Sequence, residues 1–320
     1  MTSRERVKRI LNFETPDRFA YNFPEPFGSD FNSTSPDPSP DKRLRQGKDL
    51  WGCIWQGFDY TNLGEVTDSP LKNWDDFHKL TIPSLDMEGQ WDRAKAARAV
   101  APDKYIIGMG VSLYERVHFV RGLENTWCDI LEEPENLSKF INLLADMNIE
   151  ILHRYAEYGI DGIMNLDDWG LQNRLMIDPA AWRRLWKPAY KRVYSAAKSL
   201  GLSTWLHSCG YIVDIIDDLI EIGLDVLQLD QQENMGLENL QQFRGQVTFY
   251  TPVDIQAVMP KGDTDEIRMY CRKMFESLGT KAGGFIPCWY SDPIGAGHSR
   301  ESIDAMCNEF INISHEIYGK

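Results

Sequence analysis

Residues 162–168 read GIMNLDD, a short apolar run that ends in two acidic residues. Similar runs recur as YIIGMG at 105–110, TWLHSCG at 204–210, VLQLD at 226–230, VTFY at 247–250 and GFIPC at 284–288. Helical patterns separate them, at about 137–158, 179–200, 213–222, 263–278 and 302–318. Short apolar strands that alternate with helices predict repeated βαβ units and a parallel sheet.

The number of these units and the length of 320 residues favour a closed (β/α)8 TIM barrel over an open, doubly wound sheet. No G-x-G-x-x-G turn opens a helix after a strand, and no Walker motif occurs, so the phosphate-binding turns of nucleotide-binding folds are missing. We expect one domain over 1–320. Residues 1–100 carry an N-terminal helix, a Pro-rich loop and an aromatic segment, and 101–320 carry the regular units.

The N-terminal part is irregular. A helical pattern covers 3–13, and five prolines between 22 and 48 predict a long loop of the kind that covers a functional site. The following stretch, WGCIWQGFDY at 51–60, is typical of an aromatic strand or hairpin. Its four aromatic residues fit either core packing or a wall that faces a ligand.

Charge and composition exclude some functions. The net charge of −14 and the isoelectric point near 4.9 argue against a nucleic-acid partner. No apolar run is long enough to span a membrane, and the polar start of the chain is unlike a signal segment, so we expect a cytoplasmic protein. The six cysteines lack the spacing of a disulfide framework, which indicates thiols or metal ligands.

Polar side chains gather directly after the predicted strands. In a barrel the carboxyl ends of the strands form one face, and active sites lie there. Residues far apart in the sequence are therefore expected to meet at this face. They are Asp167, Asp168, His207, Cys209, Gln228, Asp230 and Cys288.

His207 and Cys209 place two metal-binding side chains on one turn, and Cys288 can supply a third from a later strand. Three protein ligands with a fourth position open are the pattern of a catalytic zinc site. Thiolate ligands also suit zinc better than magnesium or calcium. A packed histidine with two buried thiols is the alternative interpretation of the same residues.

Several segments together resemble the uroporphyrinogen decarboxylase superfamily, especially its cobalamin-linked methyltransferase branch. The segments are LYER at 113–116, RGLEN at 121–125, DDWG at 167–170, WLHSCG at 205–210, LIEIGLD at 219–225 and GFIPC at 284–288. The resemblance implies a zinc ion on His207, Cys209 and Cys288. It also implies methyl transfer to or from a separate corrinoid protein, which would bring the cobalamin.

The porphyrinogen decarboxylases themselves carry an arginine-rich motif, Met-Arg-Gln-Ala-Gly-Arg-Tyr, that binds substrate carboxylates. The corresponding stretch here is YNFPEP at 21–26, which contains no arginine. A strongly negative protein is also a poor host for a substrate with many carboxylates. Decarboxylation is therefore not expected.

For the reaction, we expect an aryl methyl ether as the methyl donor. Ten tryptophans, four of them near expected site segments, suit a flat aromatic substrate. A small anionic thiol would want an arginine or lysine near the zinc, whereas the strand ends offer mostly acidic or aromatic groups. Zinc would polarise the ether oxygen, and Asp167 or Asp168 would orient the donor or manage a proton. The expected substrate-binding residues are Asn165, Trp169, Gln228, Trp289 and Tyr290.

Two other functions remain open. The methyl group could pass from a methylated corrinoid to a thiol or folate-type acceptor. Alternatively, the chain could be a zinc-binding partner of a corrinoid protein without activity of its own. A homodimer is one candidate assembly.

Overall fold

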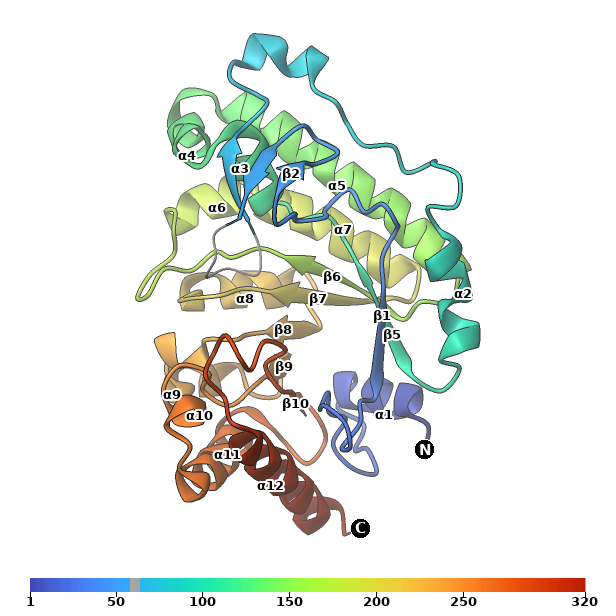
Figure 1. The fold of residues 1–320 in the computed structure, drawn as a ribbon, viewed down its shortest axis with the longest axis vertical. Helices are drawn as coiled ribbons and strands as arrows, with labels where there is room; N and C mark the ends of the chain where they lie inside the picture. Colours follow the sequence, from blue (N-terminus) through green and yellow to red (C-terminus); the bar gives the residue numbers. More distant parts are fainter. Residues whose placement is uncertain (58–63, 320) are drawn as a thin grey trace.

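A computed structural model describes residues 1–57 and 64–319. Phe58 and Tyr60 of the aromatic segment lie outside the described residues. Seven parallel strands form the main sheet in the order β1-β5-β6-β7-β8-β9-β10 (Figure 1). They are β1 (Phe31–Thr34), β5 (Tyr105–Met109), β6 (Gly162–Leu166), β7 (Ser203–His207), β8 (Val226–Gln228), β9 (Thr248–Thr251) and β10 (Phe285–Pro287).

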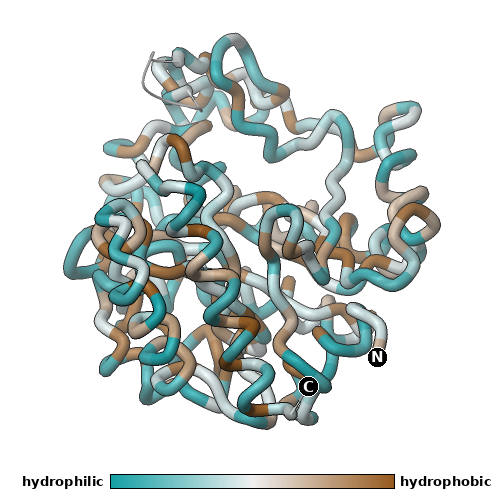
Figure 2. Tube along the Cα trace, turned by 60° about the horizontal axis from the view of Figure 1, so that its bottom comes forward, coloured by the Kyte–Doolittle hydropathy of each residue, from teal (hydrophilic) through white to brown (hydrophobic). Residues whose placement is uncertain are grey.

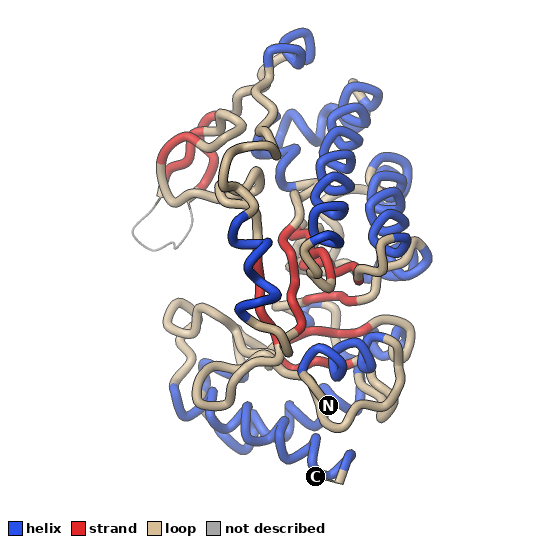
Figure 3. The backbone as a smooth tube through the Cα atoms, turned by 90° about the vertical axis from the view of Figure 1, so that its right-hand side faces the viewer, coloured by secondary structure: helices blue, strands red, loops and turns tan. Residues whose placement is uncertain are grey.

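Helices follow the strands and cover the outside of the sheet (Figure 3). The longer ones are α5 (Pro134–Glu157), α7 (Lys187–Ser199), α8 (Val213–Glu221), α11 (Thr264–Leu278) and α12 (Arg300–Tyr318). Apolar and hydrophilic residues alternate along them, as expected for helices with one buried face (Figure 2). None of the helices in the described ranges is long and apolar enough to cross a membrane.

Shorter helices lie in the connections between these elements. The α-helices are α2 (Asp92–Val100), α3 (Glu115–Arg121), α4 (Leu123–Glu132), α6 (Pro179–Leu185), α9 (Leu237–Leu240) and α10 (Val258–Lys261). The 3-10 helices are η1 (Trp74–Lys79), η2 (Gln232–Asn234) and η3 (Gln241–Phe243).

One predicted helix is broken. The pattern at 179–200 forms α6 and α7, with the break at Trp186. Pro188 explains it, because proline has no N–H for the carbonyl group four residues earlier and its ring crowds that carbonyl. The predicted N-cap at Asp178 is confirmed, since its carboxylate accepts the N–H groups of Ala180 and Ala181 at 2.7 and 3.2 Å.

The sheet is strongly curled. The rings of Phe31 on β1 and Tyr250 on β9 lie 5.7 Å apart, although five strand-to-strand steps separate β1 from β9. In a flat sheet those steps would span roughly 24 Å. Trp205 on β7 lies between them, 5.8 Å from Phe31 and 5.7 Å from Tyr250. The sheet therefore bends round a packed aromatic interior.

Asn22 links the two edge strands. It forms a parallel bridge with Cys288, next to β10, and an antiparallel bridge with Ser29, just before β1. A single residue thus occupies the place of an eighth strand, and full closure of the predicted (β/α)8 barrel is not confirmed. Pro24 and Pro26 follow directly, and residues without an N–H cannot extend a central hydrogen-bond ladder.

The helix α1 (Ser3–Leu11) lies at the amino ends of the strands (Figure 1). Thr2 and Glu5 form a capping box at its start. Its buried residues Val7 and Ile10 belong to the same apolar cluster as Tyr105 and Trp205. The helix therefore closes the base of the curled sheet and leaves the carboxyl ends of the strands as the open face.

The predicted Pro-rich loop contains one strand, because FNST at 31–34 forms β1 on the edge of β5. A sequence with only one apolar residue gave no strand signal. Beyond it, a small antiparallel sheet comprises β2 (Gly47–Lys48), β3 (Ile54–Gln56) and β4 (Glu65–Asp68). Trp51 and Trp55 are 1% and 2% exposed, so in the described part of the aromatic segment core packing is the correct interpretation.

A buried arginine on α3 holds the Pro-rich N-terminal loop against the rest of the fold. Arg116 on α3 is fully buried and pairs with Asp41 at 3.2 Å and with Asp49 at 2.8 Å. The indole N–H of Trp51 donates to the carbonyl oxygen of Pro40 at 2.7 Å. The stretch from Pro40 to Trp51, at the end of the loop, is therefore held to α3 and to itself.

We expect Arg116→Ala to lower the free energy of unfolding by about 3–5 kcal/mol, because it leaves the buried carboxylates of Asp41 and Asp49 without their cationic partner. Urea unfolding followed by circular dichroism measures this. Arg192→Ala is the control: its pair with Asp146 is exposed, and its loss should cost less than about 1 kcal/mol. Equal effects of the two substitutions would contradict the role given to Arg116.

Candidate metal centre and adjoining cavity

Strand register sets the frame of the site. Leu166 pairs with His207, His207 with Gln228, and Gln228 with Tyr250. These residues lie at the carboxyl ends of β6 to β9, so their side chains form one row across the open face. Asp168 and Cys209 follow in the next turns of chain.

The loops that carry Asp168 and Cys209 lie against each other. The N–H of Gly170 donates to the carbonyl of Cys209 at 3.1 Å. A Cβ atom at Gly170 would lie 2.3 Å from the backbone nitrogen of Tyr211, closer than any side chain can come. Glycine at this position therefore allows the two loops to meet.

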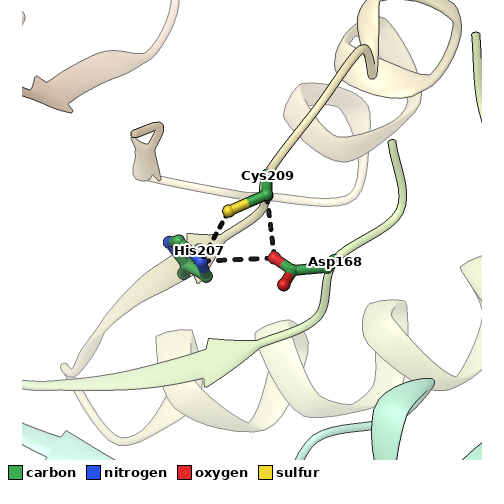
Figure 4. Close-up of side chains that lie close together, drawn as sticks. All are labelled: Asp168, His207 and Cys209. Atoms are coloured by element: carbon green, nitrogen blue, oxygen red, sulfur yellow. Dashed lines mark hydrogen bonds and ion pairs between the residues drawn. The ribbon is translucent and has the colours of Figure 1, made fainter. Parts of the chain in front are cut away.

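Asp168, His207 and Cys209 bring their ligand atoms within 4.8 Å of one another (Figure 4). Asp168 Oδ1 lies 3.2 Å from His207 Nε2, and Cys209 Sγ lies 3.5 Å from the same nitrogen. The backbone N–H of Cys209 also donates to Asp168 Oδ1 at 2.8 Å. One nitrogen, one oxygen and one sulfur thus face a common point.

Gln228 fixes the histidine ring. Its Oε1 contacts His207 Nδ1, and its Nε2 donates to Asp230 Oδ1 at 2.7 Å. An amide oxygen only accepts, so Nδ1 of His207 carries a hydrogen and Nε2 is the atom turned toward Asp168 and Cys209. A partner of this kind on the far nitrogen is usual for a metal-binding histidine.

The charges in the cluster depend on one another. Burial would lower the pKa of His207, but its hydrogen bonds with Asp168 and Cys209 raise that pKa well above its ordinary value. Burial would likewise raise the pKa of Asp168, but the hydrogen bond and charge of His207 hold it below its ordinary value. Without a metal, the histidine is therefore held as a cation beside a carboxylate.

The two separations measured from His207 Nε2 fit a zinc ion. A tetrahedral zinc with bonds of about 2.0 Å to nitrogen and oxygen and about 2.3 Å to sulfur sets nitrogen about 3.3 Å from oxygen and about 3.5 Å from sulfur. The observed separations are 3.2 and 3.5 Å. The set of donors also suits zinc better than a hard cation.

Cys288, the third predicted ligand, is not part of this cluster. It is 3% exposed and lies directly after β10, where it helps to line a cavity together with Gln228 and Asp230. Burial and the charge of Asp230 raise the pKa of its thiol well above the ordinary value. Among the described residues, Asp168 takes the place beside His207 and Cys209 that was expected for Cys288.

The cavity has a volume of about 480 Å³ and opens between the strand ends. Phe31, Tyr250, Trp289 and Tyr290 contribute aromatic rings to its wall, and Asp230 is the one carboxylate among its described lining residues, which include no lysine or arginine. Of the predicted substrate-binding residues it contains Gln228, Trp289 and Tyr290. Its other lining residues are Asn22, Ser29, Phe31, Asn32, Ser33, Ile107, Met109, Met164, Leu166, Tyr250 and Ser291.

Asn165, Asp167 and Trp169 have partners in the core and do not line this cavity. Asp167 accepts the N–H groups of Leu113, Tyr114 and Glu115 at 2.7–3.1 Å and the hydroxyl of Tyr190 at 2.5 Å. Burial raises the pKa of Asp167 to about 7. Its geometry is that of a carboxylate that holds the start of α3.

The other two residues are buried in a similar way. Asn165 donates to the carbonyl of Val111 at 2.9 Å. Trp169 stacks on Tyr114 with ring centroids 4.1 Å apart, and its indole N–H donates to Tyr190. These contacts support the positions of the loops around the site.

Arg43 is a residue that sequence reasoning missed. It comes from the Pro-rich loop, pairs with Glu115 and donates to the carbonyl of Leu166 at 3.4 Å. Its charge helps to lower the pKa of Asp168. The strand ends themselves carry mostly acidic or aromatic groups, as expected, but a loop without periodicity brings one cation close to them.

The chain is similar to known proteins of one superfamily. The sequence profile of a family described as uroporphyrinogen decarboxylase (URO-D) matches residues 60–287. A uroporphyrinogen decarboxylase of Bacillus mycoides is 25% identical over 179 residues, which cover 53% of this chain and 50% of that protein. The methylcobamide:CoM methyltransferase MtbA of Methanosarcina mazei is 24% identical over 190 residues, 58% of this chain and 55% of that protein.

These matches span about half the length of the curated relatives. Across the whole chain, the fold is similar to a solved structure described as a methyltransferase from Methanosarcina mazei, with a TM-score of 0.71. That match covers 98% of this chain and 99% of the other at 14% identity, so it shows a shared fold. The resemblance inferred from the sequence is confirmed for the superfamily, and the similarity to the MtbA sequence supports its methyltransferase branch.

For the metal, we expect about one zinc per chain by elemental analysis, and strong loss of zinc in His207→Ala and Cys209→Ser. X-ray absorption should show two sulfur neighbours at about 2.3 Å if Cys288 completes the site, and one in Cys288→Ser. Cys128→Ser, a change at an exposed cysteine on α4, is the control. A single sulfur in the unaltered protein would give the third position to Asp168, and full zinc retention in Cys209→Ser would remove the site.

Proposed function

This chain belongs to the uroporphyrinogen decarboxylase family, and from that premise we propose that it is a zinc-dependent methyltransferase. It moves a methyl group from an aryl methyl ether to the Co(I) of a separate corrinoid protein. One observation carries the proposal: a zinc-compatible cluster of Asp168, His207 and Cys209 lies beside an aromatic cavity without cationic lining among the described residues.

The cluster of Asp168, His207 and Cys209 supports this chemistry. His207 and Cys209 would hold zinc, with Asp168 beside them and Cys288 available from the cavity wall. Bound zinc supplies Lewis acidity, which polarises an ether oxygen and makes a phenolate a better leaving group. Asp230 and Gln228 keep the imidazole of His207 in the orientation that presents Nε2.

The cavity supports an uncharged aromatic donor. The rings of Phe31, Tyr250, Trp289 and Tyr290 offer flat apolar surface, and about 480 Å³ accommodates a substituted benzene. The porphyrinogen of the decarboxylases carries many carboxylates, which need cationic partners. This cavity has one carboxylate and no cation among its described lining residues, so decarboxylation of such a substrate is not supported.

Access also fits a protein partner. The helix α1 covers the amino ends of the strands, and the cavity is lined by residues toward their carboxyl ends. A corrinoid carried by a partner protein would reach the methyl group from that face. The cobalamin therefore belongs to the partner and the zinc to this chain.

A second function has its own support. Arg43 lies next to Asp168, and a cation near the metal suits the anionic group of a small thiol acceptor. The similarity to a methylcobamide:CoM methyltransferase points the same way. However, Arg43 is paired with Glu115 and is absent from the cavity wall, so the aryl ether remains the first proposal.

Methyl transfer can be followed by the conversion of cob(I)alamin to methylcobalamin in the visible spectrum. We expect the zinc-loaded protein to accept guaiacol and veratrole, and to accept methoxybenzoate less well, because no cation of the cavity wall meets its carboxylate. His207→Ala should lose at least about 100-fold in rate, since metal polarisation is worth several kcal/mol. Methylation of thiols by methylcobalamin, without reaction of any ether, would instead support the second function.

A further inference from the structure

Tyr250 is a cavity residue that the proposed chemistry has not yet used. It lies on β9, paired in register with Gln228 on one side and Ile286 on the other. It therefore stands in the same row as His207, one strand beyond Gln228. Tyr250 lines the cavity together with Cys288 and Asn22, and its hydroxyl oxygen lies 2.7 Å from the side-chain nitrogen of Asn22.

The ring of Tyr250 is held in place. Phe31 and Trp205 lie against it, each with its centroid 5.7 Å away, at interplanar angles of 46° and 82°. These contacts come from β1 and β7, on opposite sides of the interior. The hydroxyl is therefore presented to the cavity by a rigid aromatic support.

Asn22 determines which hydrogen bond the hydroxyl of Tyr250 can still make. Its side-chain N–H donates to the Tyr250 oxygen at 2.7 Å. The backbone of Asn22 is fixed as well, since it donates to Pro287 at 3.2 Å and accepts from Trp289 at 3.0 Å. With an N–H on its oxygen, the hydroxyl of Tyr250 is left to donate its own hydrogen, which has no acceptor within the described ranges 1–57 and 64–319.

Other groups keep this hydrogen in place. Burial, followed by the charges of Cys288 and Asp230, raises the pKa of Tyr250 well above its ordinary value. The phenol therefore stays protonated at neutral pH. A protonated, fixed and unused donor in an aromatic cavity is suited to meeting a substrate oxygen.

We propose that the Tyr250 hydroxyl, oriented by Asn22, donates a hydrogen bond to the substrate oxygen that loses its methyl group. This inference rests on the proposed function and assigns a second group to the same oxygen. A zinc ion held by the cluster of Asp168, His207 and Cys209 would act on one lone pair of that oxygen, and Tyr250 would act on another.

The proposed methyl transfer conserves atoms and charge. The methyl carbon forms its new bond with the electron pair of Co(I), and the pair of the O–CH3 bond stays on the oxygen. The hydrogen bond from Tyr250 strengthens as negative charge appears there. The tyrosine keeps its proton, and the released phenolate takes a proton from water.

The first test is the dependence of the methyl-transfer rate on the acidity of the departing phenol. Removal of one such donor costs about 100-fold or more in rate. We expect the methyl-transfer rate of Tyr250→Phe to fall by this factor with methyl ethers of weakly acidic phenols. The rate should fall much less with nitrophenyl methyl ethers, because nitrophenolate is a good leaving group without a hydrogen bond. A purely structural role would lower all rates by one factor, which would overturn the proposal.

Two further variants sharpen the comparison. Asn22→Asp turns the donor into an acceptor that captures the Tyr250 hydrogen, so it should reproduce the selective loss. Tyr105→Phe is the matched control, because Tyr105 belongs to the same interior cluster but its hydroxyl contacts Ser203 and Asp161, away from this cavity. Tyr105→Phe should show no selective loss with weakly acidic phenols.

The second test needs no methyl transfer. Nitrophenol is titrated on the zinc-free protein, and its absorption reports the phenolate fraction. A hydrogen-bond donor favours phenolate, so the pKa of bound nitrophenol should be lower in the unaltered protein than in Tyr250→Phe. If this shift is present while no ether is demethylated, the proposed function fails and the role of Tyr250 stands. If the shift is absent, or nitrophenol does not bind, the role of Tyr250 is overturned.

Discussion

The positions of the site residues depend on the backbone pairing of parallel strands in one register. Leu166, His207, Gln228, Tyr250 and Ile286 are successive partners across β6 to β10, held by main-chain hydrogen bonds that no side chain has to supply. Each neighbour along this row stands one strand spacing, about 4.8 Å, from the next. The metal ligand, the residue that orients it and the cavity tyrosine are thus spaced by the sheet itself. A slip of one residue in any strand would turn that member of the row away from the cavity.

Much of this could be predicted from the sequence. The apolar runs and the polar residues at their ends gave the strands, the open face and the pair His207 and Cys209. Asn165 and Asp167 were predicted as site residues but do not line the cavity. The reason is that side chains alternate along a strand and the loop that continues it. Leu166 and Asp168 fall on the inner side, so Asn165 and Asp167 face the surrounding helices. Applied to 162–168, that rule would have separated the two aspartates.

Other parts of the site had no signal in the sequence. Asn22, Arg43 and the strand at 31–34 belong to a segment rich in proline, where neither helical nor strand periodicity operates. Their positions depend on contacts with residues far along the chain, such as the bridge of Asn22 to Cys288 and the pair of Arg43 with Glu115. The buried Arg116 with Asp41 and Asp49 is of the same kind. Only the folded chain reveals which of these polar residues come together.

In the reaction proposed above, α1 covers the amino ends of the strands, so the methyl donor and the corrinoid partner share the face at the carboxyl ends. A donor that binds first lies beneath the partner, with its methyl group toward the cobalt. A partner that docks first would stand in the way of the donor. The architecture at one end of the curled sheet, remote from any reacting atom, thereby favours one order of events at the other: donor in, partner on, partner off, phenol out.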